Sequence, residues 1–466
     1  MATFSSHVAI LLVIFQLFTI LVHNHLANCD PIAIKARETL EIGIGGGSGG
    51  GIGIGIGVGG GGGGETPSAN APPPDNYNQN CPPPPPPPVC PFTFESKRIE
   101  IVYPVIQKLR AKIKHDPHGI TNTWVGPDIC NKYKGFNCAI VPDYKVKALY
   151  AVQFNGFNFS GPDLTLDGFI DELPDLSIFH SNSNNFTGII PKKISKIKYL
   201  FELDLSNNKF SGTFPYDVLG ANNLTFLDLR FNSFYGTIPP QVFTLDLDVL
   251  FINNNNFVQC IPDNIGSLPV LFLVLANNKL TGSIPSSIGN ASKTLLEVVF
   301  LNNQLSGCLP CEIGLLTQLR LFDVSKNQLT GQIPHSFACL ARLEILNLAN
   351  NQFFGSIPDP ICQLMHLYRF NLSYNYFTGV GPECWKLIHR KVLDVNMNCI
   401  PGLPNQRSKA ECEAFLCKPR SCNNQRSLSW VPCSGKNYQP AIGNSQGQGK
   451  PAGLPLSYGA LKPHLR

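Results

Sequence analysis

Charged residues are scarce in this 466-residue chain: Asp, Glu, Lys and Arg make up 14% of it, and histidine occupies 10 positions. The sequence has no H-E-x-x-H metal site, no phosphate-binding loop and no nucleophile elbow joining a strand to a helix. The motifs of many hydrolases, nucleotide-dependent enzymes and zinc enzymes are therefore missing. We expect a protein that is not an enzyme and needs no cofactor or metal, and nothing in the sequence predicts nucleic-acid binding.

Long apolar runs are also missing beyond residue 30. The early run VAILLVIFQLFTILV is shorter than the roughly 20 apolar residues of a membrane-spanning helix, and it indicates a signal peptide over residues 1–29. The polar C-terminal segment has no lipid-anchor signal. We expect a secreted protein, and its 16 cysteines can therefore form disulfides in an oxidising compartment. Cleavage after Cys29 would leave an odd number of cysteines, which makes a disulfide-linked homodimer a candidate assembly.

Acceptor sites for N-linked glycans fit the same compartment. The pattern N-x-[ST] marks asparagines that a secreted protein exposes to glycosylation. It predicts glycans at Asn158, Asn185, Asn223, Asn290 and Asn371.

Residues 30–91 are low in complexity and predict a flexible linker. The glycine run at 43–64 contains G-x-G-x-x-G matches, but no strand precedes it and no helix follows, which argues against a dinucleotide site. The stretch CPPPPPPPVC ends the linker. As a polyproline II rod rising about 3.1 Å per residue, it would hold Cys81 and Cys90 roughly 28 Å apart, too far for a mutual disulfide. We expect a stiff spacer there.

A repeat begins at Leu149. The segment LFELDLSNNKFSGTFP at 200–215 is followed by LTFLDLRFNSFYGTIP at 224–239, and the closing prolines recur every 23–25 residues. The alternating leucines predict one short strand per unit, with apolar side chains that stack on those of the next unit. About ten such units over 149–382 predict an α/β solenoid of the leucine-rich repeat type.

One asparagine of each repeat stands where the chain turns away from the strand. Its side chain is suited to bond backbone groups that the turn leaves unpaired, so we predict a buried asparagine ladder with a structural role. The ladder positions are Asn184, Asn208, Asn232, Asn255, Asn278, Asn303, Asn327, Asn351 and Asn375.

The two ends of a solenoid expose apolar surface and need caps. The segment TWVGPDICNKYKGFNC predicts an N-terminal cap over 92–148, and the cysteine-dense residues 383–433 predict a C-terminal cap or hinge. Residues 434–466 are predicted to be disordered. Four cap cysteines are predicted to form disulfides, although the pairing within 384–433 is left open: Cys130, Cys138, Cys399 and Cys412.

Two further cysteine arrangements lie within the repeats. The sequence CLPC at 308–311 has the spacing of a redox or zinc half-site, but it has no second pair, so structural disulfides are favoured. Cys339 and Cys362 occupy nearly equivalent positions in neighbouring units, and a bridge between them would cross the convex side.

The G-x-[IL]-P repeats, the cap motif and the hinge MNCIPGLPNQRSKAEC together resemble the leucine-rich repeat extensin family of plant cell walls. The resemblance covers residues 92–422. Family members add a C-terminal tail of Ser-Pro-Pro-Pro-Pro repeats, which does not occur among the residues after Cys422. The resemblance implies a plant-type extracellular horseshoe in the cell wall or apoplast. It also implies binding of basic, cysteine-rich signalling peptides of the rapid alkalinisation factor type, which control wall integrity and growth, with a receptor kinase as an indirect partner.

The charge distribution supports a basic ligand. Residues 149–382 contain 12 Lys+Arg and 17 Asp+Glu, a net charge of −5, so the remaining segments carry +10 to reach the overall +5. Acidic repeats attract a basic peptide, and the basic flanks suit demethylated pectin, a polyanion. The competing interpretation is that the charges only keep the chain soluble.

Positions beside the strand leucines are expected to project from the concave face. There, carboxylates next to exposed aromatic rings would suit a peptide held by charge and apolar contacts, unless the phenylalanines pack laterally against each other. A glycan on Asn371 would restrict the patch to the first repeats. His180 is interpreted as a surface or partner contact. The predicted peptide-binding residues are Glu202, Asp204, Phe226, Asp228, Arg230, Phe251 and Phe272.

Two other functions are compatible with the sequence. One is inhibition of pathogen wall-degrading enzymes, as in polygalacturonase inhibitors, which usually lack the cysteine-rich hinge. The other is a purely structural wall glycoprotein.

Overall fold

The structure is a computed structural model that describes residues 92–418, 422, 428–434 and 456–463. The signal peptide over 1–29, the linker over 30–91 and the Cys81–Cys90 spacer lie outside the described residues. Among the residues it does describe, no helix has the length and apolar character needed to cross a bilayer.

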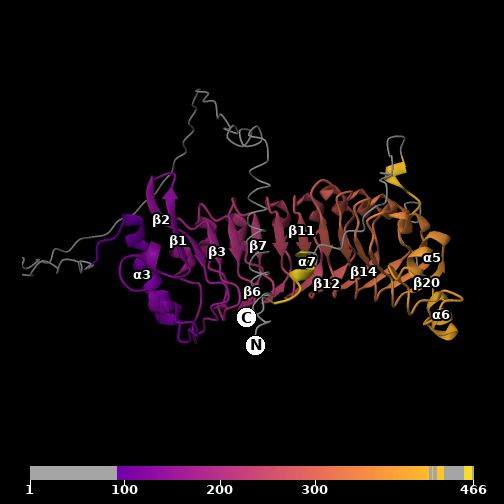
Figure 1. The fold of residues 1–466 in the computed structure, drawn as a ribbon, viewed down its shortest axis with the longest axis horizontal. Helices are drawn as coiled ribbons and strands as arrows, with labels where there is room; N and C mark the ends of the chain where they lie inside the picture. The colour runs from indigo at the N-terminus through magenta and orange to yellow at the C-terminus, as the bar shows by residue number, and fades with distance from the viewer. Residues whose placement is uncertain (1–91, 419–421, 423–427, 435–455, 464–466) are drawn as a thin grey trace, which may run out of the picture. The chain divides into compact units, whose positions relative to one another are not determined.

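The repeats form two sheets, one on each side of the core (Figure 1). In the larger sheet, neighbouring strands are parallel apart from the antiparallel pair at its N-terminal edge. Its order is β1(Phe136–Val141), β2(Val146–Gln153), β3(Ile178–His180), β5(Glu202–Asp204), β7(Phe226–Asp228), β9(Val249–Phe251), β11(Phe272–Val274), β13(Glu297–Val299), β15(Leu321–Asp323), β17(Ile345–Asn347), β19(Arg369–Asn371) and β21(Leu393–Asp394). This arrangement is the predicted leucine-rich repeat solenoid.

The second sheet uses the residues that follow each strand turn. Its strands are β4(Thr187–Gly188), β6(Lys209–Thr213), β8(Ser233–Gly236), β10(Asn256–Cys260), β12(Lys279–Gly282), β14(Gln304–Cys308), β16(Gln328–Gly331), β18(Gln352–Ile357) and β20(Tyr376–Val380). Short 3-10 turns then close each repeat: η2(Ile170–Glu172), η3(Lys192–Lys196), η4(Tyr216–Gly220), η5(Pro240–Thr244), η6(Ile265–Ser267), η7(Ser286–Ala291), η8(Cys311–Leu315), η9(His335–Cys339) and η10(Asp359–Gln363).

Stacking of equivalent side chains builds one continuous core. The central residue of each short strand points inward; Leu203, Leu227 and Leu250 are fully buried and stand in register. Phenylalanines of the second sheet stack in the same way, with Phe210 placed between Phe186 and Phe234. Each repeat therefore buries apolar surface mainly against its two neighbours.

The asparagine ladder is present as predicted. In one rung, the Asn208 amide donates to the carbonyls of Ser181, Leu205 and Ser206, and its oxygen accepts from the backbone N–H of Phe186 at 3.0 Å. Equivalent bonds recur at the other ladder asparagines and extend to Asn398 in the degenerate last unit. The ladder thus pairs the backbone groups that the turns leave open.

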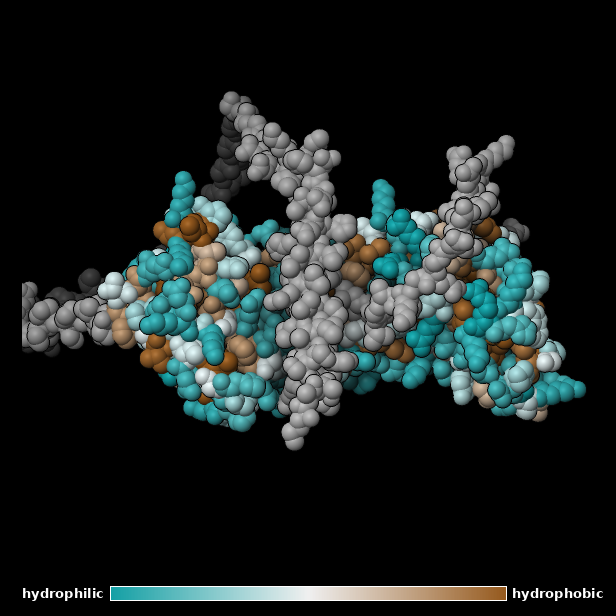
Figure 2. Space-filling model, in the orientation of Figure 1, coloured by the Kyte–Doolittle hydropathy of each residue, from teal (hydrophilic) through white to brown (hydrophobic). Residues whose placement is uncertain are grey.

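The N-terminal cap consists of α3(Lys97–Lys112), η1(Ile120–Thr123), α4(Ile129–Lys132) and the β1–β2 hairpin. Trp124 is fully buried against Phe136 and Phe154, and its indole N–H donates to the carbonyl of Lys134. The structure pairs Cys130 with Cys138. Figure 2 shows apolar surface near this end, where the hairpin exposes hydrophobic side chains.

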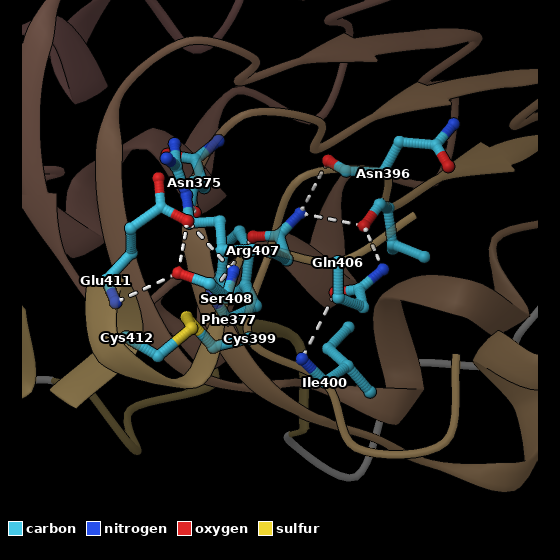
Figure 3. The surroundings of a disulfide bond; sticks show 12 residues. Asn375, Phe377, Asn396, Cys399, Ile400, Gln406, Arg407, Ser408, Glu411 and Cys412 are labelled. Atoms are coloured by element: carbon cyan, nitrogen blue, oxygen red, sulfur yellow. Dashed lines mark hydrogen bonds between the residues drawn. A yellow bond between two sulfur atoms is a disulfide. The ribbon is translucent and has the colours of Figure 1, made fainter. Parts of the chain in front are cut away.

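The C-terminal cap contains α5(Pro382–His389) and α6(Lys409–Leu416). The Cys399–Cys412 disulfide joins the last turn of the solenoid to α6, and a capping box between Ser408 and Glu411 starts that helix (Figure 3). Beside it, Arg407 Nε donates to the carbonyl of Asn375 at 2.8 Å. The hinge motif is therefore fastened to the ladder itself.

Long-range disulfides differ from one sequence-based expectation. Cys339 does not bridge to Cys362: Cys339 pairs with Cys433, and Cys362 pairs with Cys384. Neighbouring repeats place equivalent residues side by side, but Cys384 belongs to helix α5 of the C-terminal cap and Cys433 to the chain that returns from it. In the CLPC motif, Cys308 forms a disulfide with Cys422.

The returning chain reaches well back along the repeats. Residues 428–434, which include η12(Pro432–Ser434), lie against η9, where the backbone N–H of His335 donates to the carbonyl of Leu428. Farther on, α7(Leu456–Gly459) packs on β11 and β13. The expectation of disorder over 434–466 is therefore wrong for residues 456–463, because this short stretch finds partners that local sequence patterns do not reveal.

Candidate functional site

The register of four strands brings the predicted patch together. Glu202 pairs with Phe226, and Phe226 pairs in turn with Val249, beside Phe272 on the next strand. One column over, Asp204 pairs with Asp228, and Asp228 pairs with Phe251. Arg230 comes shortly after β7, separated from its last residue by Leu229. All seven predicted residues thus lie on β5, β7, β9 and β11 or just after them.

The patch contains an ion pair that sequence reasoning missed. His180 Nε2 lies 2.8 Å from Glu202 Oε2, and both side chains are almost wholly buried. Burial alone would lower the pKa of His180, but the bond to Glu202 and the nearby carboxylates outweigh it and raise the pKa. His180 on β3 is paired with Asp204 on β5 in the sheet register, so it lies diagonally across from Glu202.

The aspartates are held by local polar groups. Asp204 accepts hydrogen bonds from the Ser206 backbone at 2.9 Å and from the Asn182 amide at 2.8 Å. Asp228 accepts from the Arg230 backbone N–H, and its Oδ2 lies 3.0 Å from the guanidinium Nε of Arg230. Burial raises the pKa of Asp228 to about 8 despite the nearby Arg230.

Aromatic rings line the same strands. The Arg230 guanidinium lies 5.3 Å from the ring centre of Phe251, a cation–π contact. Phe226 packs edge-on against Phe251 and also contacts the ring of His180. Lateral packing of the phenylalanines, the alternative considered from the sequence, therefore does occur for this pair.

The expected exposure of the patch is not met. Phe226 and Phe272 are half-buried, and the other five predicted residues are buried: Glu202, Asp204, Asp228, Arg230 and Phe251. The repeat pattern predicts which column of a strand faces away from the core, whereas the packing along that face depends on neighbours that the pattern does not specify.

The described C-terminal segment lies farther along the same sheet. Residues 456–461 contact β11 and β13, beside the patch residues of β9 and β11. No motif signalled this contact. It is separate from the predicted residues on β5 and β7.

The predicted glycan acceptors fall in two groups. Asn223 and Asn290 are exposed, whereas Asn158, Asn185 and Asn371 are half-buried. The side-chain oxygen of Asn371 accepts hydrogen bonds from both the backbone and the hydroxyl of Ser373. The described residues contain no cluster of His, Cys, Asp or Glu arranged for a metal ion.

Comparison with known proteins identifies the repeats. The family described as Leucine Rich Repeat matches residues 199–220, 223–245, 270–291, 318–340 and 342–364. Leucine-rich repeat extensin-like protein 1 of Arabidopsis thaliana is 56% identical over 332 residues, which cover 71% of this chain and 44% of that protein. Leucine-rich repeat extensin-like protein 6 of Arabidopsis thaliana is 46% identical over 329 residues, which cover 70% of this chain and 68% of that protein.

This chain spans less than half the length of the first of these relatives. Among solved structures, a plant ice-binding protein aligns with a TM-score of 0.55 and 25% identity, covering 67% of this chain and 98% of that protein. That likeness supports the solenoid architecture.

Proposed function

Because this chain belongs to the leucine-rich repeat extensin-like family, we propose that it is a secreted protein of the plant cell wall that binds a basic, cysteine-rich signalling peptide. The proposed ligand is of the rapid alkalinisation factor type. It would lie on the sheet face formed by β5, β7, β9 and β11, and binding there would serve wall integrity and growth control. A receptor kinase would take part indirectly.

The observation that carries this proposal is the carboxylate cluster on adjacent strands. Glu202, Asp204 and Asp228 lie on the adjacent strands β5 and β7, where His180 pairs with Glu202 and Arg230 pairs with Asp228. The wider repeat region adds a net charge of −5 from 12 Lys+Arg and 17 Asp+Glu. A basic peptide would approach faster for this reason, and the half-buried rings would supply apolar contact.

The burial of these aspartates determines which substitutions can test the proposal. Lysine at position 204 or 228 would bury a cation close to Arg230 and endanger the fold. Asn and Gln replacements keep the shape and hydrogen bonds while removing charge. The informative variants are therefore Glu202→Gln and Asp204→Asn; Asp228 is left unchanged, because its pKa of about 8 keeps its side chain largely protonated, and so uncharged, at neutral pH.

The experiment measures association of a synthetic basic, cysteine-rich peptide with the immobilised full chain at low and high salt. We expect each neutral variant to slow association by about threefold to tenfold, with the difference shrinking at high salt. Asp217→Asn in η4 is the matched control, since it removes one carboxylate from the same part of the chain but from outside the sheet face. Equal association by all the variants would contradict the proposal.

A capture experiment addresses the other functions. Incubation of the full chain with secreted plant proteins and with microbial polygalacturonase separates peptide binding from enzyme inhibition. Inhibition of the enzyme without peptide capture would replace the proposed function.

A further inference from the structure

The last described residues make a specific set of contacts with the large sheet. Residues 456–463 hold the one-turn helix α7, which packs on β11 and β13. Ser457 and Ala460 are almost wholly buried, although they lie far from these strands in sequence. This segment is therefore held on the sheet face by side chains of the repeats.

A tyrosine hydroxyl is recognised by a buried carboxylate. Tyr458 donates to Asp323 Oδ2 at 2.6 Å. Asp323 is 1% exposed, and its two oxygens also accept from the Asn347 amide and from Ser325, so its orientation is fixed. Burial and the adjacent Asp323 raise the pKa of Tyr458, which keeps the hydroxyl protonated as a donor.

Two further side chains form hydrogen bonds with the backbone of the segment. The backbone N–H of Ser457 donates to Glu297 Oε2 at 2.9 Å. The amide of Asn253, which is fully buried, donates to the carbonyl of Ala460 at 2.9 Å. Glu297, Asn253 and Asp323 belong to three different repeats, so the contacts require the assembled sheet.

Two positions of the described segment have small, buried side chains. The buried Ser457 and Ala460 leave little space for larger residues. At Gly459, by contrast, a β-carbon would meet no atom within 4 Å. The contacts thus define a short turn in which a small residue precedes a tyrosine, any compatible residue follows, and a second small residue comes next.

We propose that Asn253, Glu297 and Asp323 form a binding site for a short peptide turn of the type small–Tyr–x–small, and that residues 457–460 occupy it as a tethered ligand. The site goes beyond the proposed binding of a basic peptide, because it uses no residue of the carboxylate cluster and recognises a neutral turn. An external peptide with the same turn competes with the chain's own segment for this site.

Tethering sets the expected strength of that competition. A ligand joined to its site by the same chain has an effective concentration on the order of millimolar. An external peptide therefore binds appreciably only when the tethered segment is weakened. A substitution within the segment should weaken its binding and leave the site available to an external peptide, while the repeat sequence stays unchanged.

The first experiment uses a fluorescent peptide of residues 454–463 and the full chain. We expect this peptide to bind the Tyr458→Ala chain at least about tenfold more tightly than the unaltered chain, because the tethered competitor is lost. Phe in place of Tyr458 within the peptide should weaken binding by about tenfold, since the buried carboxylate loses its partner. Ala in place of Gly459 should leave binding unchanged. Equal binding to both chains, or equal binding of a scrambled peptide, would overturn the proposal.

The second experiment observes the tethered segment directly. Hydrogen exchange at 456–462 should quicken in the full-length Tyr458→Phe and Asp323→Asn chains, because each loses the same contact. Tyr374→Phe, at an exposed tyrosine, is the control. Unchanged exchange in Tyr458→Phe would show that the segment does not occupy the site. Association of the basic peptide with the Glu202→Gln chain tests the carboxylate cluster separately, because Glu202 lies on β5 whereas α7 packs on β11 and β13.

Discussion

His180 Nε2 and Glu202 Oε2 lie 2.8 Å apart on adjacent parallel strands, and this pair borders the aspartates of β5 and β7. The pKa of His180 is raised by its bond to Glu202 and by the nearby carboxylates, and burial raises the pKa of the neighbouring Asp228 to about 8. These two groups couple the charge of the candidate binding face to the pH of its surroundings.

Stability should fall as the pH rises through neutrality. The pKa of His180 is raised, so its stabilising contribution is full below its unfolded value near 6.5 and is lost as pH rises through the folded pKa. Burial raises the pKa of Asp228 to about 8, so the folded protein binds a proton there that the unfolded chain has already released. This contribution to stability is full below the unfolded pKa, about 3.9, and is lost as pH rises toward about 8. Urea unfolding between pH 5.5 and 9 measures the slope. The Asp228→Asn chain should show a flatter profile, and a stability that rises with pH would contradict the assignment.

The ladder asparagines should matter more than their exposed neighbours. Asn278→Ala leaves buried backbone carbonyls and the N–H of Phe257 without partners, and we expect a loss of about 2 kcal/mol or more in the free energy of unfolding. Gln304→Ala, at an exposed position close by, should change it by less than about 0.5 kcal/mol. Denaturant melts of both chains provide the comparison, and similar midpoints would argue against the ladder's role.

The N-terminal cap depends on one buried ion pair. Arg98 makes two hydrogen bonds to Asp175, which is 3% exposed, and this contact raises the pKa of Arg98. Arg98→Met should cost about 2–4 kcal/mol, because it leaves a buried carboxylate unpaired. Lys193→Ala breaks an exposed pair with Glu172 and should cost less than about 1 kcal/mol. Thermal unfolding of the two variants tests the contrast.

The two long-range disulfides should help to hold the tethered segment. Cys433→Ser removes the bond to Cys339 and lengthens the free connection before α7, so the effective concentration of residues 456–461 falls. We expect faster hydrogen exchange in that segment and stronger binding of the external 454–463 peptide. Exchange in β5 and β7 should stay as it is, and a uniform increase across all repeats would instead indicate general unfolding.

The repeats were predictable because their signal is periodic. The leucine spacing specifies the inward column of every strand, and the ladder asparagines mark every turn, so the sheet register and the grouping of Glu202 with Asp228 follow from the sequence. The pairing of Cys339 with Cys433 and the contact of Tyr458 with Asp323 could not be found in this way. Both join residues far apart through a chain that has no repeat, and their geometry depends on the assembled solenoid. The burial of Asp228 is likewise a tertiary property.

The Cys339–Cys433 bond also determines how a pulling force would pass through the molecule. Tension applied at the C-terminus beyond Cys433 crosses directly to η9, because the covalent link is shorter than the path through residues 340–432. Strands β17, β19 and β21 and helices α5 and α6 lie within that bypassed segment. They would stay unstretched while the repeats up to η9 bear the load, which the Cys308–Cys422 bond shares from β14 onward, so the last repeats and the hinge would keep their shape under mechanical strain.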